Sequence, residues 1–271
     1  MKKKLYFYIW VSPDFERNIA VLTHKACLKR YIGVFDEINF IAAVDDYPSI
    51  DGDLLKAIAF INDVCGNREY NLTIVKNDPN TGEFHPFCQT ILPLITRGND
   101  EMVFYGHIKG ISDVNMPFRN AYSVLRWSIS MYYYSLEHVA DAEEKLKNGY
   151  SAYGSLLTHF EINPGVALQN HNKFYLGTFY WINPRYAHDN LYYNRVPNEF
   201  KTRFLSENFP MLLKEESLAS YNMVCTENTV ADLYFLRKEN WPRYLSYYGD
   251  SDILYKIQNE IITEICGDEG Y

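Results

Sequence analysis

The chain has 271 residues, of which 47% are hydrophobic and 22% are charged. This length and composition predict a folded protein with a sizeable core and argue against a disordered chain. The formal net charge of −8 argues against a nucleic-acid-binding protein, because such a protein needs a basic face for the phosphate backbone. No stretch approaches the roughly 18 consecutive apolar residues of a membrane span, so we expect no membrane span.

The cysteines and the first residues predict a cytoplasmic protein. The five cysteines are odd in number and widely spaced, without a Cys-x-x-Cys pair, which is typical of reduced thiols. The basic residues 1–4 precede the apolar run Leu5–Val11, which is too short for a secretory signal and has no small-residue cleavage site after it. We therefore expect this run to be part of a first strand.

The first half of the chain alternates strand-like and helix-like segments. Strands are expected at four apolar runs: Lys4–Val11, Glu37–Val44, Asn71–Lys76 and Met102–Tyr105. Helical spacing of apolar residues lies between them, at Ile19–Arg30, Leu54–Ile61 and Pro86–Ile95. Strands that alternate with helices predict an α/β fold with a mainly parallel, Rossmann-like sheet flanked by helices.

The second half begins with a long helix and then becomes irregular and rich in aromatic residues. Apolar residues at alternating steps of four and three predict a helix from Phe118, which continues through a charged stretch to Lys147. We expect further strands at Tyr150–Leu157 and Phe174–Ile182, and a last helix at Asp252–Ile265. Because no linker or repeat interrupts the chain, we expect one domain of residues 1–271.

Polar residues follow each of the first four predicted strands, and the most informative set is His107-Ile108-Lys109-Gly110. In α/β proteins, ligands bind beyond the carboxyl ends of the strands. Lysine offers a positive charge suited to phosphate, histidine is a donor or proton carrier, and glycine lets a ligand approach the backbone. The alternative is that His107 packs in the core and Lys109 is only solvated.

The order of these strand ends resembles the nucleotide-sugar half of a GT-A-fold glycosyltransferase. More narrowly, residues 80–84, Val103–Gly110 and Gly177–Trp181 look like motifs of a group of glycosyltransferases that carry a His-x-Lys-Gly motif, akin to rhamnan-synthesis-F-type proteins of polysaccharide loci. The resemblance covers roughly residues 4–190. It implies a GT-A-like fold, with the nucleotide-sugar-binding half in residues 1–112 and the acceptor half with C-terminal helices in residues 113–271.

The resemblance also implies a nucleotide-sugar site made of residues at or near the strand ends: Val11, Ser12, Asp45, Asp46, Asn77, Glu83, His107, Lys109 and Gly110. An aspartate at the end of an apolar strand can accept hydrogen bonds from a ribose or a base. For Asp45 and Asp46 the alternative is a turn signal, since Asp-Asp-Tyr-Pro starts loops readily. For Glu83 the alternative is a carboxylate at a helix start that holds no ligand.

We expect no metal cofactor. In the GT-A fold an Asp-x-Asp pair holds a divalent metal on the diphosphate, and here His107-Ile108-Lys109 stands in its place. A lysine ammonium has no lone pair for a cation, but its fixed charge beside the leaving diphosphate can replace the metal. The triplets Asp51-Gly52-Asp53 and Asp250-Ser251-Asp252 precede helical patterns, so we interpret both as helix starts.

Transfer also needs a general base and an acceptor site. Glu207, flanked by apolar residues, and Asp113, just past Gly110, are the candidate bases, although an ordinary loop or helix-end carboxylate is an alternative reading of Glu207. Gly177 and Trp181 are candidates for an acceptor or sugar wall, because flat rings stack on sugar faces. Core packing is the alternative for Trp181.

The expected function is therefore hexosyl or deoxyhexosyl transfer from a nucleotide-sugar donor to a glycan or polysaccharide acceptor. Two alternatives stay open. One is a catalytically inactive sugar- or nucleotide-binding subunit of a polysaccharide assembly complex. The other is a nucleotide-sugar hydrolase, which would release the sugar to water.

Overall fold

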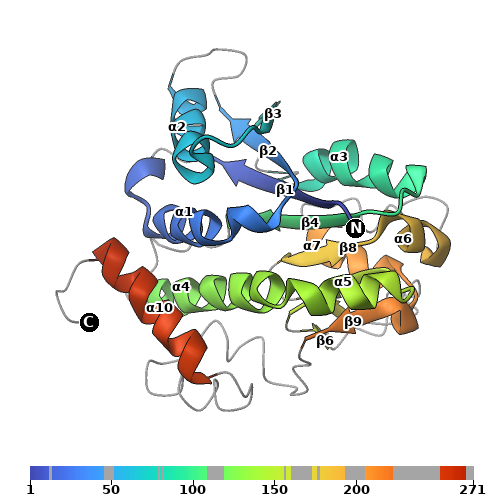
Figure 1. The fold of residues 1–271 in the computed structure, drawn as a ribbon. Coiled ribbons are helices and arrows are strands. Elements are labelled where there is room, and N and C mark those ends of the chain that lie inside the picture. The colour runs from blue at the N-terminus through green and yellow to red at the C-terminus, as the bar shows by residue number, and fades with distance from the viewer. Residues whose placement is uncertain are drawn as a thin grey trace.

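A computed structural model gives the protein an α/β architecture, as the sequence predicts. It describes residues 1–11, 14–45, 52–78, 80, 82–108, 119–155, 157–159, 173–175, 178–192, 205–221 and 251–266. A seven-stranded, mainly parallel sheet runs through the molecule and is flanked by helices (Figure 1). The predicted fold class is confirmed.

The sheet has the strand order β3-β2-β1-β4-β8-β5-β9. Its strands are β1 Lys3–Trp10, β2 Glu37–Val44, β3 Asn71–Lys76, β4 Met102–His107, β5 Ala152–Gly154, β8 Tyr180–Ile182 and β9 Leu218–Ser220. Only β8 pairs antiparallel to its neighbours, β4 and β5, so it runs against the other six. A separate antiparallel pair joins β6 Leu157–His159 to β7 Lys173–Tyr175.

Helices cover both faces of this sheet. They are α1 Ile19–Tyr31, α2 Asp53–Cys65, α3 Phe84–Arg97, α4 Arg119–Tyr132, α5 Val139–Lys147, α6 Pro184–Asn190, α7 Leu205–Asn208 and α10 Ser251–Cys266. Helix α1 packs against α2, α4 and α10, whereas α3 packs against α6 and α7. Figure 1 shows α1 and α3 on opposite sides of β1 and β4.

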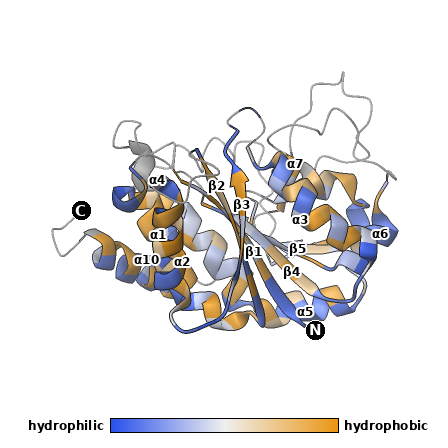
Figure 2. Ribbon diagram, turned by 90° about the horizontal axis from the view of Figure 1, so that it is seen from above, coloured by the Kyte–Doolittle hydropathy of each residue, from blue (hydrophilic) through white to orange (hydrophobic). Residues whose placement is uncertain are grey.

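Burial explains why β4 reads as a continuous apolar run. All six residues of β4 are buried, as expected for a strand covered on both faces. Figure 2 shows hydrophobic residues along the central strands. Most buried apolar residues form one cluster, which includes Phe7, Phe104 and Trp181. The proposed division into residues 1–112 and 113–271 stays a prediction.

Two helix ends follow the expected local chemistry. The side chain of Asn18 accepts a hydrogen bond from the amide of Ala20 at 2.9 Å, which caps the start of α1. Helix α3 ends at Gly98, whose φ of 63° is left-handed and whose amide donates to the carbonyls of Leu94 and Ile95.

Three predicted elements are wrong in detail. The single strand expected at Tyr150–Leu157 is instead β5 and the start of β6, which lie in different sheets. The long helix expected from Phe118 to Lys147 is divided, because a π-helical turn at Tyr133–Glu137 separates α4 from α5. The single strand expected at Phe174–Ile182 is two short strands, β7 and β8, in different sheets. Thr178, between them, has a φ of 62°, which a regular strand does not contain. None of the helices in the described ranges is long and apolar enough to cross a membrane.

Candidate functional site

The carboxyl ends of the first four strands meet at one edge of the sheet. Three backbone hydrogen bonds continue the parallel pairing beyond the strands: Val11 donates to Ala43 at 3.1 Å, Asn77 to Val44 at 3.0 Å and Ile108 to Tyr8 at 3.2 Å. Val11, Asp45, Asn77 and His107 therefore lie along the same edge, as the sequence predicts from their positions after the strands.

Asp45 and Asn77 contact each other at this edge. The side-chain amide of Asn77 donates to Oδ1 of Asp45 at 2.7 Å. This bond joins the ends of β2 and β3 and orients one oxygen of an exposed carboxylate. A carboxylate has a second oxygen that can accept from a hydroxyl or a ring N–H.

Glu83 and His107 form the buried part of the site. His107 Nδ1 is hydrogen-bonded to Glu83 Oε1, and the side chains are only 10% and 13% exposed. Oε2 of Glu83 accepts from the hydroxyl of Ser206 at 2.8 Å and from that of Tyr105 at 3.2 Å. One carboxylate thus binds three side chains, which come from β4 and α7.

The local fold explains why these groups meet. Glu83 is the residue before the first turn of α3, but its side chain makes no cap bond to that helix. The carboxylate instead reaches β4, where Tyr105 and His107 are two residues apart and so share one face of the sheet. The ring of Phe87, from α3, packs edge-on to Tyr105 with centroids 5.1 Å apart, so this is the face that α3 covers.

The Glu83 carboxylate determines which ring nitrogen of His107 carries a proton. A carboxylate at Nδ1 favours a proton on that nitrogen and stabilises the imidazolium, while Nε2 lies on the opposite side of the ring. Burial raises the pKa of Tyr105 well above its usual value, so its hydroxyl stays protonated and donates to Glu83. The group can therefore hold His107 as a donor to an anion or as a proton carrier.

Gly106 lies in tight aromatic packing beside His107. A Cβ added there would lie 3.3 Å from the rings of Phe104 and Phe7 and 3.4 Å from that of Phe179. The ring of Phe179 also lies edge-on to His107, with centroids 6.3 Å apart and an interplanar angle of 81°. A larger residue at 106 would displace the rings that support the histidine.

The other predicted site residues have different outcomes. Ser12, Asp46, Lys109, Gly110, Asp113 and Gly177 lie outside the described residues. The backbone of Glu207 lies in α7, directly after Ser206, and α7 packs against α3. The candidate base is therefore next in sequence to a residue that contacts Glu83.

The structure places Trp181 in the core rather than at the edge. It is 0% exposed, and its Nε1 donates to the carbonyl of Ser135 at 2.7 Å. The rings of Phe104 and Phe35 pack against it, with centroids 5.1 and 5.6 Å away. These contacts favour the core-packing alternative over a sugar wall.

Two of the four aspartates that we interpret as helix starts lie where that interpretation expects them. Asp53 begins α2 and pairs with Lys56 at 3.0 Å, one turn along the helix. Asp252 lies in the first turn of α10, whereas Asp51 and Asp250 lie outside the described residues.

Sequence reasoning missed Tyr105 and Ser206. Tyr105 could have been found from the sequence, because it lies two residues before His107 and side chains two apart in a strand share one face. Ser206 had none, since it lies 123 residues from Glu83 in the chain.

Within the described ranges, no three His, Cys, Asp or Glu side chains gather into a group that could hold a metal ion. Asp46 and Asp113 lie outside those ranges, so independence from metal stays a prediction.

No protein-family model and no curated protein sequence matches the chain. Among solved structures, the chain is similar to the crystal structure of 4-diphosphocytidyl-2C-methyl-D-erythritol synthase. The alignment covers 87% of this chain and 98% of that one, with 10% identity and a TM-score of 0.39. At this level of similarity, nothing about the reaction of this chain follows from it.

Proposed function

We propose that the chain is a glycosyltransferase that moves a hexosyl or deoxyhexosyl group from a nucleotide sugar to a glycan or polysaccharide acceptor. The observation that carries this proposal is the Glu83–His107 pair, held by Tyr105 and Ser206 at the carboxyl edge of the sheet. The order of motifs around this edge, which resembles GT-A-fold enzymes, also supports it.

In this proposal His107 and Lys109 contact the diphosphate of the donor. Negative charge grows on the diphosphate as the bond to the anomeric carbon breaks, and cations placed beforehand stabilise that charge. Glu83 is a positioning residue, because its carboxylate orients the imidazole and favours its protonated form. No divalent metal is needed for this role, since the charges of the two side chains replace it.

Glu207 is the proposed general base, and Asp113 is the alternative. The acceptor hydroxyl gives its proton to the carboxylate, and its oxygen bonds to the anomeric carbon. The bond from that carbon to the diphosphate oxygen breaks, and its electron pair leaves with the nucleoside diphosphate. The position of α7 beside α3 supports Glu207, since Ser206 of that helix contacts Glu83.

The nucleoside is proposed to lie along the ends of β1, β2 and β3. Asp45, oriented by Asn77, accepts from its hydroxyl or N–H groups, and Asp46 takes part from the next position. Val11, Ser12 and Gly110 are proposed to line the donor by their backbone, and Gly177 the acceptor side. Cys27 and Cys65 are buried thiols, which supports placing the protein in the cytoplasm.

Release of nucleoside diphosphate from a panel of nucleotide sugars tests the proposal. Each donor is incubated in EDTA with and without a panel of glycan acceptors, using the wild type, His107→Gln, Lys109→Ala and Glu207→Gln. We expect release that requires an acceptor, persists in EDTA and falls in all three variants.

Three other results would contradict the proposal. Release that is equally fast without any acceptor would identify a hydrolase. Donor binding without release would identify an inactive binding subunit. Release unchanged in Lys109→Ala would remove that lysine from the site. Glu143→Gln, at the opposite end of the strands, is the matched control and should release at the wild-type rate.

A further inference from the structure

Thr178 lies just before β8, next to a residue that contacts His107. The antiparallel pairing of β4 with β8 sets Tyr105 opposite Tyr180. Thr178 precedes Tyr180 by two residues, and the ring of Phe179 between them packs edge-on to that of His107, with centroids 6.3 Å apart. This contact places the backbone of Thr178 near the carboxyl edge of the sheet.

The backbone of Thr178 is strained. Its φ is 62°, and it is the one non-glycine residue with a positive φ in the part of the chain that the structure describes. A β-branched side chain is strongly disfavoured in this conformation, which glycine adopts readily. Strained residues of this kind cluster at active sites and ligand clamps.

The hydroxyl of Thr178 is buried without a hydrogen-bond partner. The residue is 0% exposed, and Oγ1 has no partner among the described residues. A buried hydroxyl that makes no hydrogen bond destabilises the folded state, because it has given up its bonds to water. Two unfavourable features thus coincide in one residue, which directly precedes a residue in contact with the proposed diphosphate-binding histidine.

We propose that Thr178 Oγ1 donates a hydrogen bond to a phosphate oxygen of the bound nucleoside diphosphate, alongside His107. Phosphate oxygens are acceptors, and a hydroxyl rotates to donate to them. The ligand supplies the partner that the hydroxyl lacks in the unliganded protein. This inference rests on the proposed function, because it assigns Thr178 to the donor site proposed there.

Ser128 of α4 provides a matched control. Its hydroxyl is also buried, at 1% exposure, and also has no partner among the described residues. It lies in the interior of a helix that packs on α1 and α10 rather than at the strand ends. Ser128→Ala therefore removes a comparable hydroxyl away from the proposed site.

The test measures affinity and melting temperature together. Calorimetry gives the affinity for UDP, GDP, CDP and dTDP, and for the same nucleosides without phosphates. Thr178→Val removes the hydroxyl and keeps the side-chain shape. We expect it to raise Tm by about 2–4 °C, because an unsatisfied polar group is gone. We expect it to lower affinity for the preferred diphosphate at least about tenfold without changing affinity for the nucleoside.

The companion variants separate ligand binding from folding. Thr178→Ser keeps the hydroxyl and should bind the diphosphate within about twofold of the wild type. Ser128→Ala should leave diphosphate affinity unchanged. If Thr178→Val fails to fold, Thr178→Gly takes its place, because glycine accepts the positive φ and also lacks the hydroxyl. The same loss of diphosphate affinity is expected for it.

The outcomes distinguish this inference from the proposed function. If the wild type binds a diphosphate and the variant without the hydroxyl binds it equally well, the role of Thr178 is overturned and the proposed function stands. If nucleoside affinity falls in step with diphosphate affinity, the effect is not on the phosphate, and the role is again overturned. If the wild type binds none of the four diphosphates, both are overturned.

Discussion

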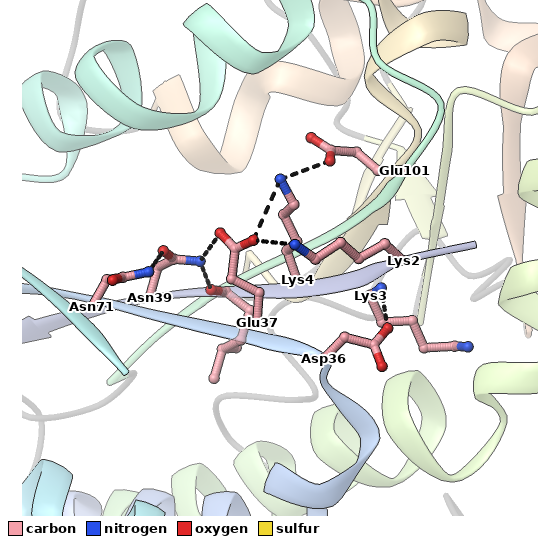
Figure 3. Close-up of polar contacts among 9 residues, drawn as sticks. Lys2, Lys3, Lys4, Asp36, Glu37, Asn39, Asn71 and Glu101 are labelled. Carbon is pink, nitrogen blue, oxygen red and sulfur yellow. Dashed lines mark hydrogen bonds and ion pairs between the residues drawn. The ribbon is translucent and has the colours of Figure 1, made fainter. Parts of the chain in front are cut away.

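The two ends of the same parallel strands carry polar groups arranged in opposite ways. At the amino end, shown in Figure 3, lysines and carboxylates neutralise one another. Lys4 lies 2.7 Å from Glu101 and 3.6 Å from Glu37, and Lys2 lies 2.8 Å from Glu37. Asn39 donates to Glu37 at 3.3 Å, so these carboxylates are engaged by groups of the protein itself.

At the carboxyl end, the carboxylate of Glu83 is instead hydrogen-bonded to the imidazole ring of His107. Glu83 gathers His107, Tyr105 and Ser206, and Thr178 lies buried next in sequence to Phe179, whose ring packs on His107. At the amino end, the ion pairs between lysines and carboxylates stabilise the fold. In the proposed function, the edge that holds His107 and the strained, buried Thr178 binds the donor. The comparison predicts that substitutions at the amino end change stability and those at the carboxyl end change activity.

The largest effect is expected for His107→Gln. The glutamine amide keeps a donor toward Glu83 but carries neither a charge nor a transferable proton. We expect turnover of the nucleotide sugar to fall about 10²–10³-fold, as for loss of one group that stabilises developing charge. Steady-state kinetics measures this, with Tm as a check on folding. Turnover within threefold of wild type would remove His107 from the reaction.

Lys4→Met tests the amino end. It leaves Glu101, which is 7% exposed, without its lysine. We expect the free energy of unfolding to fall by about 2–3 kcal/mol, somewhat less than for a fully buried pair because Lys4 keeps some contact with water. Urea unfolding measures this loss, and Glu101→Gln in the same chain should recover part of it. A fall in turnover per folded molecule would contradict the separation of the two ends.

Glu83→Gln tests the positioning of His107. A neutral amide stabilises the imidazolium less than a carboxylate does, so the histidine should lose its proton at a lower pH. We expect turnover near neutral pH to fall about 10–30-fold, and the decline of activity with rising pH to begin at a lower pH. A pH–rate profile measures both. An unchanged profile would show that Glu83 does not act through the histidine.

Glu143 of α5 pairs with Lys3 of β1. Its substitution, Glu143→Gln, has the smallest expected effect on stability. The ammonium groups of Lys147 and Lys3, each 2.8 Å away, hold the pKa of Glu143 well below its usual range. Because the pKa is lowered on folding, this stabilisation is present above about pH 4.5 and is lost as the pH falls toward the folded-state pKa. We expect the variant to lose about 1 kcal/mol at pH 7.

Unfolding curves of both proteins at pH 7 and pH 3 measure this difference. It should shrink at the lower pH, because the carboxylate of the unfolded wild-type chain is protonated there and the unfolded state gains stability. A difference that grows as the pH falls would contradict the assigned pairs.

Local sequence signals predicted the strands that lie in the parallel part of the sheet. Residues 37–44 and 71–76 form strands with the expected bounds, because each run is closed by polar or turn-forming residues. The strand expected at residues 174–182 failed for a non-local reason. Apolar residues stand on both sides of Gly177-Thr178 and read as one run, whereas residues 173–175 and 180–182 pair with strands of different sheets, which no local pattern records.

The edge of the site was predictable, but its internal contacts were not. Positions after strand ends identified Asp45, Asn77 and His107, since parallel strands bring their carboxyl ends together. The bond from Ser206 to Glu83 joins residues far apart in the chain and had no sequence signal. Trp181 could not be assigned because an aromatic residue in an apolar run suits a core and a sugar wall equally well.

Thermal shift with nucleoside diphosphates and nucleotide sugars, with and without EDTA, tests the donor site most directly. A rise in Tm that is specific for one nucleotide, survives EDTA and disappears in His107→Gln is the expected result. At a ligand concentration 100 times Kd, the rise should be about 5 °C or more. No rise with any nucleotide, or a rise that EDTA abolishes, would contradict a metal-free donor site at the carboxyl edge.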